Sequence, residues 1–461
     1  MAEAIAAICT GLTPGGIGVI RVSGDNSIEI VDKVFKNPSN VKLVEANSHT
    51  VHYGHIYDGI ELIDEVMAIV LKAPRSFTTE DTVEIDCHGG VYVLKKVLDV
   101  VLKNGARLAE PGEFTKRAFV NGRIDLTQAE AVMDLIASKN ELSRKNSISQ
   151  INGLLYKKIV DLRERILHEL AFIEAALDDP EHISLEGFYD EMSVKINDIE
   201  KEISSLLATF DNGRFLKEGI NTAIVGKPNV GKSSILNMLI GEDRAIVTNV
   251  AGTTRDALIE TVSFGGITLN LIDTAGIHDT EDVVEKIGVE KSLSYVDSAD
   301  LAIFIVDTSR EFDIEDENII KMLENKKSIC LLNKSDLTIK LDKTNLSNYF
   351  NKHNIDPVFI NTSATTGEGK EDIINTIKEM FFKGEININD ELVITNLRQK
   401  AALEAALKSV NNVKNSVENL MPEDFLSIDL SDAYALLGEI IGEEVSDDLV
   451  EKIFKEFCMG K

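Results

Sequence analysis

The chain has 461 residues, and its 48 Lys and Arg against 77 Asp and Glu give a formal net charge of −29. This length suits about three domains. So acidic a chain argues against broad non-specific binding to nucleic acid. An RNA substrate would therefore need a local basic surface or a partner that supplies one. There is no apolar run near the ~18 residues of a membrane span and no basic-then-apolar leader, and the four cysteines show no C-x-x-C spacing, which favours a reduced cytoplasmic protein with no membrane segment.

Residues 1–120 combine strand-like runs with one helical run, which predicts an α+β domain. The strand-like segments are 4–9, 18–22, 52–57, 65–71 and 82–87, and residues 91–103 have helical periodicity. Three polar islands interrupt them, at 21–24 (RVSG), 84–90 (EIDCHGG) and 111–117 (PGEFTKR). A turn with a capping histidine explains His88-Gly89-Gly90 about as well as a functional site does. A metal site is not favoured, because His88 has no partner at metal-ligand spacing.

Two stretches with helical periodicity, 121–215 and 384–461, flank the centre of the chain. The first carries a long apolar stripe on an otherwise charged helix. The stripe consists of Ile151, Leu155, Ile159, Leu162, Ile166, Leu170, Ile173 and Leu177. We expect it to pack against helices of the second stretch, with a partner-binding groove as the alternative. The central part, 216–383, would then be inserted into one helical-bundle domain, with joints at Asp211-Asn212-Gly213 and 384–390.

The central part contains a phosphate-binding loop, because residues 226–233 (GKPNVGKS) fit the pattern G-x-x-x-x-G-K-[ST] at every defined position. A strand-like run precedes the loop and a helix-like run follows it, so backbone N–H groups and the helix dipole point at one anion site. Lys232 would reach the β- and γ-phosphates, and the Ser233 hydroxyl would ligate Mg²⁺.

Four further motifs follow in the order that a GTPase requires, each after or near a strand-like run. Residues 252–256 (GTTRD) supply a switch threonine, and in 273–276 (DTAG) Asp273 holds the Mg²⁺ shell while the Gly276 N–H meets the γ-phosphate. In 333–336 (NKSD) the carboxylate of Asp336 can accept from both the N1–H and the 2-amino group of guanine. Adenine lacks this pair of donors, so the motif selects GTP over ATP. Residues 362–364 (TSA) offer a backbone N–H to guanine O6. The predicted GTP contacts are Asn229, Val230, Gly231, Lys232, Ser233, Ser234, Thr248, Asn249, Val250, Ala251, Gly252, Thr253, Thr254, Asp273, Thr274, Ala275, Gly276, Asn333, Lys334, Asp336, Ser363 and Ala364.

Near its end the chain carries Cys458, followed by Met459, Gly460 and Lys461. The thiol is either a buried spare cysteine ahead of a frayed tail or a reactive group. Lys461 nearby would favour the thiolate while the terminal carboxylate opposes it. Residue chemistry alone leaves both interpretations open.

Taken together, the RVSG, HGG and PGEF islands, the inserted GTPase and the terminal Cys-x-Gly-Lys resemble the bacterial tRNA uridine-modification GTPases called MnmE or TrmE. The resemblance runs from about Ala4 to Lys461. It implies an N-terminal α+β domain (1–120) that dimerises and binds a 5-formyl- or methylene-tetrahydrofolate. It also implies a discontinuous helical-bundle domain (121–215 and 384–461) and an inserted, potassium-activated Ras-like α/β domain (216–383).

Residue by residue, the resemblance places Arg21, Glu84, Arg123 and Lys461 at the folate, with Arg123 standing where the family often has Lys. The ligands that it implies for K⁺ are Asn229, Thr248, the Val250 carbonyl and Thr253, with Thr254 beside Ser233 at Mg²⁺. Ile277 after the DTAG motif cannot orient a water as a glutamine does. The resemblance implies that Glu285 does so, and that Cys458 is the essential terminal cysteine; a solvated helical Glu285 is the plainer alternative.

The leading hypothesis is an enzyme whose GTPase cycle drives modification of the wobble uridine of tRNA. The resemblance implies a homodimer that works with the flavoprotein MnmG to build an aminomethyl- or carboxymethylaminomethyl-type group at C5. The runner-up is a regulatory GTP switch in ribosome or RNA assembly with no modification chemistry. The polar islands and Cys458 favour the enzyme, because a switch needs neither a one-carbon cofactor nor a terminal thiol.

Overall fold

The computed structural model describes residues 3–38, 41–179, 182, 187–240, 259–272, 296–382, 392–443, 445–455, 457 and 460. The chain forms two compact units, and each unit is assembled from separate segments. One unit contains Met1–Met133, Gln150–Met192 and Lys408–Lys461, and the other contains Asp134–Ser149 and Ser193–Leu407. No helix within the described ranges is both long enough and apolar enough to cross a bilayer.

The N-terminal segment is built on a seven-stranded sheet with the order β3-β4-β5-β6-β2-β1-β7. Neighbouring strands pair antiparallel, except for β1 and β7, which are parallel. The strands are β1 Ile5–Ile8, β2 Ile17–Ser23, β3 Phe35–Lys36, β4 Thr50–Asp58, β5 Glu61–Leu71, β6 Thr82–His88 and β7 Arg107–Leu108. The five predicted strands and the predicted helix are confirmed, with ends that differ by a few residues.

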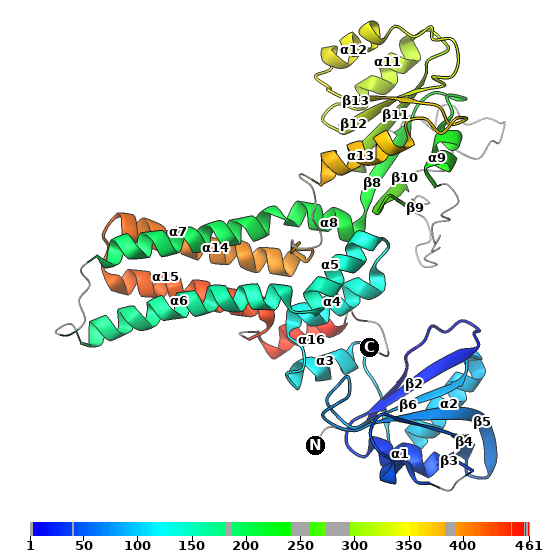
Figure 1. Cartoon of the computed structure of the whole chain (residues 1–461), viewed down its shortest axis with the longest axis vertical. Helices are drawn as coiled ribbons and strands as arrows, with labels where there is room; N and C mark the ends of the chain where they lie inside the picture. The colour runs from blue at the N-terminus through cyan, green and yellow to red at the C-terminus, as the bar shows by residue number, and fades with distance from the viewer. Residues whose placement is uncertain are drawn as a thin grey trace. The chain divides into compact units, whose positions relative to one another are not determined.

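Helices α1 (Ser27–Val34) and α2 (Val91–Lys103) cover one face of this sheet, with the short 3-10 helix η1 (Leu43–Glu45) beside α1 (Figure 1). Side chains alternate between the two faces of a strand. Val83 and Ile85 of β6 are therefore fully buried against the helices, and Glu84, Asp86 and His88 belong to the other face. We call that other face the open face of the sheet.

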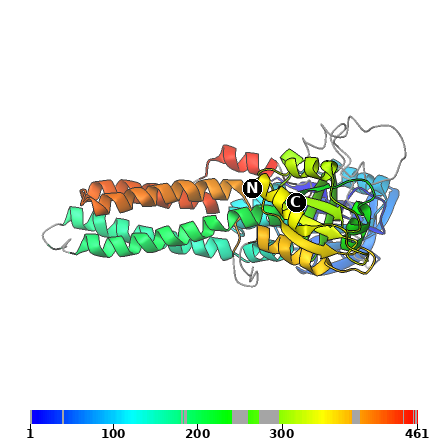
Figure 2. The same ribbon diagram turned by 90° about the horizontal axis from the view of Figure 1, so that it is seen from above.

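Helix α3 (Glu113–Val120) precedes the two helical stretches, which contribute seven further helices outside the nucleotide-binding fold among the described residues. These seven are α4 Leu126–Ala137, α5 Glu141–Ile151, α6 Leu154–Asp178, α7 Phe188–Ala208, α14 Leu397–Glu418, α15 Glu423–Ile441 and α16 Asp447–Lys455. Helix α15 packs along α6, and both views show the two side by side (Figures 1 and 2). The expected packing between the two helical stretches is thus confirmed for this pair.

The apolar stripe on α6 is shorter than the sequence predicts. Its members from Leu155 to Ile166 are fully buried, and so is Ile173, whereas Leu177 is 45% exposed. Ile151 belongs to α5, because Gly153 takes a left-handed conformation (φ 79°) and separates the two helices. The prediction of one stripe from Ile151 to Leu177 was wrong at both ends. Glycine reaches this backbone region without the steric cost that a Cβ imposes.

The central part of the chain is a six-stranded sheet with the order β13-β12-β11-β8-β10-β9. Only the edge strand β9 runs antiparallel to its neighbour. The strands are β8 Ile220–Val225, β9 Ile259–Phe264, β10 Ile267–Ile272, β11 Leu301–Asp307, β12 Lys327–Asn333 and β13 Val358–Thr362. The strand-like runs beside the GTPase motifs are confirmed.

Helices lie on both faces of this second sheet, as expected for a Ras-like α/β fold. One core joins the sheet to α9 (Lys232–Ile240) and α13 (Lys370–Phe381), and the other joins it to α11 (Ile314–Lys321) and α12 (Lys343–Lys352). Figure 1 shows α12 and α11 on one side of the strands and α13 on the other.

The expected joint at Asp211-Asn212-Gly213 is not a linker, because these residues lie inside helix α8 (Phe210–Glu218). A Cβ on Gly213 would stand 1.9 Å from the Ile394 carbonyl oxygen. The glycine therefore serves a close approach of two backbones and not a turn. The other expected joint, 384–390, lies outside the described residues.

Candidate functional site

The phosphate loop connects β8 to α9, at the edge of the sheet where the parallel strands end. The Lys232 ammonium donates to the carbonyls of Gly226 (2.8 Å) and Lys227 (2.9 Å). Burial lowers the pKa of Lys232, because desolvation disfavours the charged form and no compensating negative charge lies beside the ammonium among the described residues. An anion placed against the loop would supply that charge, so the loop is prepared for a phosphate.

Asn333, at the end of β12, ties the loop to the neighbouring strands. It is buried, and its side-chain Nδ2 donates to the Val230 carbonyl over 2.7 Å. Gly231 makes this contact feasible, since a Cβ there would stand 2.3 Å from Asn333 Nδ2 and its φ of 99° lies in the region that favours glycine. Asn333 thus positions the loop, as expected for the first residue of a guanine-recognition motif.

Lys334 reaches the same loop from the next position. Its ammonium lies 2.6 Å from Asp307 Oδ2 and 3.1 Å from the Asn229 carbonyl. Burial opposes ionisation of Asp307, but hydrogen bonds from Lys334 and Ser309 outweigh it, and the pKa of Asp307 lies below its usual value. The lysine is therefore held in place by an ionised partner at the end of β11.

Asp336 is exposed, and its carboxylate accepts a hydrogen bond from the Ser363 hydroxyl over 2.6 Å. Ser363 is fully buried and follows β13 directly. The serine donates to Oδ1 and thereby orients the carboxylate of this exposed residue. Two motifs far apart in the chain, 333–336 and 362–364, therefore meet where a guanine would bind.

Several predicted site residues lie outside the described residues. They are Thr248, Asn249, Val250, Ala251, Gly252, Thr253, Thr254, Asp273, Thr274, Ala275, Gly276, Glu285, Cys458 and Lys461. Strands β9 and β10, which lie between Thr254 and Asp273 in the chain, are described and pair along their whole length.

A second polar site lies on the open face of the N-terminal sheet, where Arg21 and Glu84 stand opposite each other on β2 and β6. Two nitrogens of the Arg21 guanidinium, Nε (2.8 Å) and Nη2 (2.7 Å), contact Glu84 Oε1. The two side chains are only 15% and 22% exposed. The predicted pair is thus brought together.

Phe77 links this pair to Arg123, a third predicted residue. The guanidinium carbon of Arg21 lies 5.5 Å from the Phe77 ring centroid, and that of Arg123 lies 4.9 Å from it. Arg123 also donates to the Phe77 carbonyl over 2.6 Å. Burial, and then the charge of Arg21, lower the pKa of Arg123. Two cations therefore share one aromatic ring, and the sequence motifs gave no signal for Phe77.

The end of the chain comes to the same sheet. The Cys9 thiol donates to the Gly460 carbonyl over 3.1 Å, across 451 positions. Gly460 has a φ of 87°, and a Cβ on it would stand 2.4 Å from the Ile8 carbonyl oxygen. This tail therefore needs glycine where it meets the end of β1, and β1 pairs with the strand that carries Arg21.

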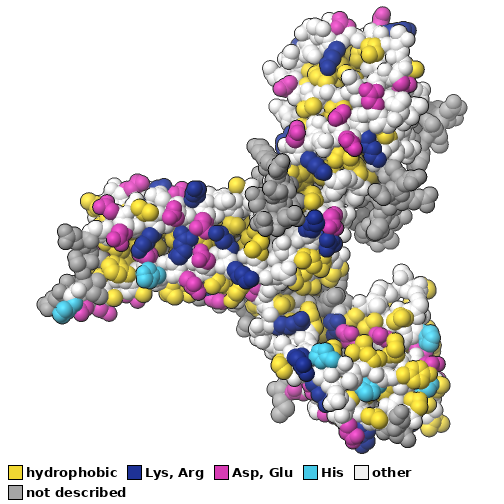
Figure 3. Space-filling model, viewed as in Figure 1, with side chains coloured by type: hydrophobic (Ala, Val, Ile, Leu, Met, Phe, Trp, Pro, Cys, Tyr) yellow, Lys and Arg dark blue, Asp and Glu magenta, His cyan; other side chains and the backbone are white. Residues whose placement is uncertain are grey.

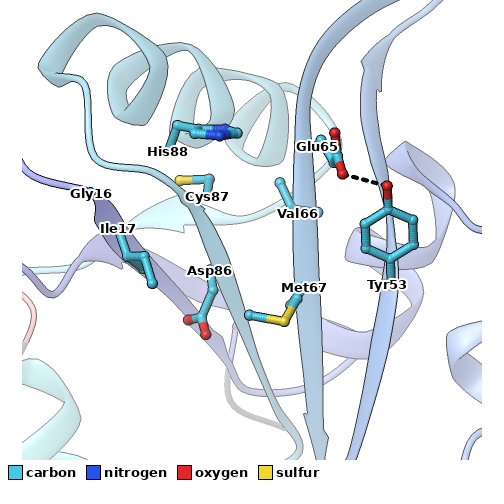
Figure 4. A pocket seen from close by; sticks show the side chains of 9 residues that line it. All are labelled: Gly16, Ile17, Tyr53, Glu65, Val66, Met67, Asp86, Cys87 and His88. Carbon is cyan, nitrogen blue, oxygen red and sulfur yellow. Dashed lines mark hydrogen bonds between the residues drawn. The ribbon is translucent and has the colours of Figure 1, made fainter.

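A shallow pocket of about 270 Å³ opens on the same face, along β4, β5 and β6. Figure 4 shows the Tyr53 hydroxyl bonded to Glu65 and the Asp86 side chain on the strand beside Met67. Burial, and then the nearby Glu84, raise the pKa of Asp86. His88 is tied to Asp64, which accepts from its backbone N–H and contacts its ring (2.8 and 2.7 Å), and this bond raises the pKa of His88.

Two of the cysteines are poor nucleophiles at neutral pH. Burial raises the pKa of Cys87 to about 12 and raises that of fully buried Cys330 further still. Only the thiolate is a good nucleophile. Burial therefore favours the protonated thiol at Cys87 and Cys330.

A phosphate loop at the edge of a doubly wound sheet, joined through Asn333 and Lys334 to a guanine-recognition motif, defines a P-loop GTPase. Residues 126–458 match the family model described as the MnmE helical domain, and residues 4–123 match that of the GTP-binding protein TrmE N-terminus. The chain belongs to the MnmE family of tRNA modification GTPases. It is an enzyme that hydrolyses GTP, bound with Mg²⁺, in tRNA modification.

Curated relatives match over the full chain. The tRNA modification GTPase MnmE of Lachnoclostridium phytofermentans is 55% identical over 460 residues, covering 100% of this chain and 99% of that protein. The MnmE of Acetivibrio thermocellus is 46% identical over 461 residues, with the same shares covered. Among solved structures, Aquifex aeolicus Era bound to GDP and aluminium fluoride is 29% identical, covering 41% of this chain and 66% of that one, with a TM-score of 0.27.

Proposed function

We propose that this GTPase, with a flavoprotein partner of the MnmG kind, builds an aminomethyl- or carboxymethylaminomethyl-type group at C5 of the tRNA wobble uridine, using a tetrahydrofolate one-carbon unit. The place of the tail is the observation that carries the proposal. Gly460 lies against Cys9, which directly follows β1, and β1 pairs with the strand that carries Arg21. In the sequence Gly460 stands between Cys458 and Lys461, so a thiol and a lysine belong to the segment that meets the Arg21 sheet.

The chemistry of the Arg21 site suits a folate. A folate carries carboxylates on its glutamate tail and amide-type N–H donors on its pterin. Two guanidiniums can bind carboxylates in the fork geometry of arginine, and Glu84 can accept from the pterin. Burial, and then the charge of Arg21, lower the pKa of Arg123, and an anion between the two arginines would stabilise both charges.

We propose K⁺ as an activating ion in the nucleotide site. The exposed Asn229 stands in the phosphate loop with a left-handed φ of 63°, and its carbonyl is already bonded to Lys334. Its side-chain oxygen would ligate K⁺ with Thr248, the Val250 carbonyl and Thr253. The ion would then neutralise the transition-state charge, the task of an arginine finger in other GTPases. Glu285 would position the attacking water.

We further propose a homodimer formed through the open face of the N-terminal sheet. Apolar side chains on this face are exposed: Ile17 by 63%, Val51 by 58%, Tyr53 by 52% and Met67 by 41%. Figure 3 shows apolar side chains and histidines at the surface of this part of the protein. An exposed apolar patch of this kind marks an interaction surface.

We propose three domains that act together in the cytoplasm. Residues 1–120 would bind folate and dimerise, residues 121–215 with 384–461 would form the helical domain, and residues 216–383 would bind GTP.

The competing function is a GTP switch in ribosome or RNA assembly, and Cys458→Ser separates the two. Serine is nearly the same size as cysteine but far less nucleophilic. If Cys458 belongs to the one-carbon site, full-length Cys458→Ser should hydrolyse GTP normally and fail to modify tRNA when supplied with the flavoprotein. Both activities are measured on one preparation, by phosphate release and by nucleoside analysis of the tRNA. Full modification would eliminate the chemical role of the thiol, and loss of both activities would indicate a structural one.

A further inference from the structure

Lys227, the second residue of the phosphate loop, has its charged side chain buried. Only 5% of the side chain is exposed, and its ammonium lies 2.8 Å from Asp316 Oδ2, with Asp313 as a second partner. Asp316 is 1% exposed. The lysine and Asp313 are 86 positions apart in the chain. The pair therefore joins the start of the phosphate loop to the first turn of helix α11.

The position is electrostatically unusual, which argues against a chance contact. The N-terminus of a helix carries the positive end of its dipole and ordinarily repels a cation. Buried ions are also costly, and leaving one of them without its partner is strongly destabilising. Lys227 stays there because two carboxylates outweigh the dipole, and its ammonium in turn lowers the pKa of Asp313.

The carboxylates are themselves fixed by the helix. Asp313 caps α11 by accepting from the N–H groups of Glu315 (3.0 Å) and Asp316 (3.4 Å), and Asp316 Oδ2 accepts from the Asp313 N–H (3.2 Å). This reciprocal capping box holds both acidic side chains in one geometry. Lys227 is thus anchored to a rigid acceptor and not to two mobile surface groups.

The backbone of Lys227 bears on the chemistry. Its carbonyl, with that of Gly226, accepts from the ammonium of Lys232, the lysine that meets the phosphates. We propose that Lys227 is a positioning residue for nucleotide binding. Its side chain fixes the first turn of the loop to α11, and the fixed carbonyls aim Lys232 at the β- and γ-phosphates. Asp313 and Asp316 are the anchor.

The chain offers a matched control on the same helix. Lys352 of α12 lies 3.0 Å from Glu317 of α11. That pair joins α11 to another helix and has no contact with the phosphate loop among the interactions of the described residues. Removing it tests whether any lysine bound to α11 has the same effect.

The experiment measures binding of fluorescent GDP and GTP to the full-length protein and its variants, with thermal unfolding recorded in parallel. Lys227→Met should weaken both nucleotides by ~10-fold or more, the scale expected when a contact group is misplaced by a fraction of an ångström. Lys227→Arg, which keeps the charge, should restore most of the affinity. Lys352→Met should leave it unchanged.

Unaltered affinity in a folded Lys227→Met protein would overturn the proposal, as would an equal loss in Lys352→Met. Failure of Lys227→Arg to recover affinity would also count against it. Should Lys227→Met not fold, Asp313→Asn replaces it, because Asn remains a good N-cap and Asp313 is 52% exposed. A folded Asp313→Asn protein should bind nucleotide measurably more weakly, and unchanged binding would overturn the role of the anchor.

Discussion

The Asn333 side-chain amide donates to the Val230 carbonyl over 2.7 Å, across 103 positions of the chain. This bond joins the residue that begins the guanine motif to the loop that holds the phosphates. Lys334 adds a second link, to the Asn229 carbonyl. The expected base-recognition motif and the phosphate loop are therefore joined by hydrogen bonds, and a disturbance at either one should reach the other.

Gly231→Ala should damage nucleotide binding, because the new Cβ would stand 2.3 Å from Asn333 Nδ2. Strain and the lost hydrogen bond together cost about 2 kcal/mol, or roughly a 30-fold weaker Kd. Gly367→Ala is the matched control, since Gly367 also has a positive φ (80°) but nothing within 4 Å of its Cβ position. Binding of fluorescent GDP checks the difference. Equal losses in the two variants would show that backbone strain, and not the contact with Asn333, matters.

Asp336→Asn should lower the preference for GTP over ATP. In its expected role the Asp336 carboxylate accepts two N–H groups of guanine, whereas an amide supplies one acceptor and one donor group. The new side chain can still accept from Ser363, so the local structure should survive. Competition of GTP, ATP and XTP for one fluorescent nucleotide measures the change, and XTP should gain because its 2-oxo group accepts from the amide. An undiminished preference for GTP would reject the role of Asp336.

Hydrolysis of GTP should be faster in K⁺ than in Na⁺ at equal ionic strength. The proposed site at Asn229 has to fit the larger ion, and a smaller ion would leave its oxygens under-coordinated. Phosphate release in the two chloride salts is the measurement, and Asn229→Ala should abolish the difference. Equal rates in both salts would remove K⁺ from the mechanism.

Glu285→Ala should leave GTP affinity nearly intact while slowing turnover by ~10²-fold or more, the scale for losing a positioned base. Single-turnover hydrolysis at saturating GTP separates the chemical step from binding. Glu285→Gln can still accept a hydrogen bond but is a far weaker base, so it should recover little. Turnover at the normal rate in Glu285→Ala would assign the water to another group.

Arg21→Lys should weaken folate binding although it keeps the charge. The lysine ammonium cannot contact Glu84 through two nitrogens while lying over the Phe77 ring, as the planar guanidinium does. We expect an affinity loss of ~10-fold, equivalent to about 1.4 kcal/mol, with GTP hydrolysis unaffected. Calorimetric titration with 5-formyl-tetrahydrofolate tests this, and Lys103→Met, which removes an exposed pair with Asp58 on the same domain, is the control. Identical folate affinity in Arg21→Lys would exclude a role for the two-nitrogen contact with Glu84.

Local motifs made much of the nucleotide site predictable. The phosphate loop and the 333–336 motif are contiguous, so residue order alone fixes which side chains lie near the end of each strand. The pairing of Arg21 with Glu84, 63 positions apart, was accessible only through the family resemblance. Phe77 carries no motif of its own, and its role depends on two arginines brought to it by different elements.

The rest could not be predicted, because it depends on contacts between distant segments. The sequence of Asp211-Asn212-Gly213 is typical of a turn, yet it is helical because tertiary packing overrides weak local preference. Lys227 occupies an undefined position of the loop pattern, and only the structure brings it to Asp313 and Asp316. The family resemblance implied that the tail returns to the N-terminal domain, because it places Lys461 with Arg21, but only the structure shows the contact of Gly460 with Cys9.

The contact of Gly213 with Ile394 has a consequence for how this protein was assembled. The chain enters the nucleotide-binding fold through α8 and leaves it again beside the same point. A domain whose two ends lie close together can be inserted into another chain, or deleted from it, without displacing the segments on either side. A short Gly-Ser bridge between Gly213 and Ile394 could then replace everything between them. The shortened chain would show directly what the remaining helices and the N-terminal sheet achieve without GTP.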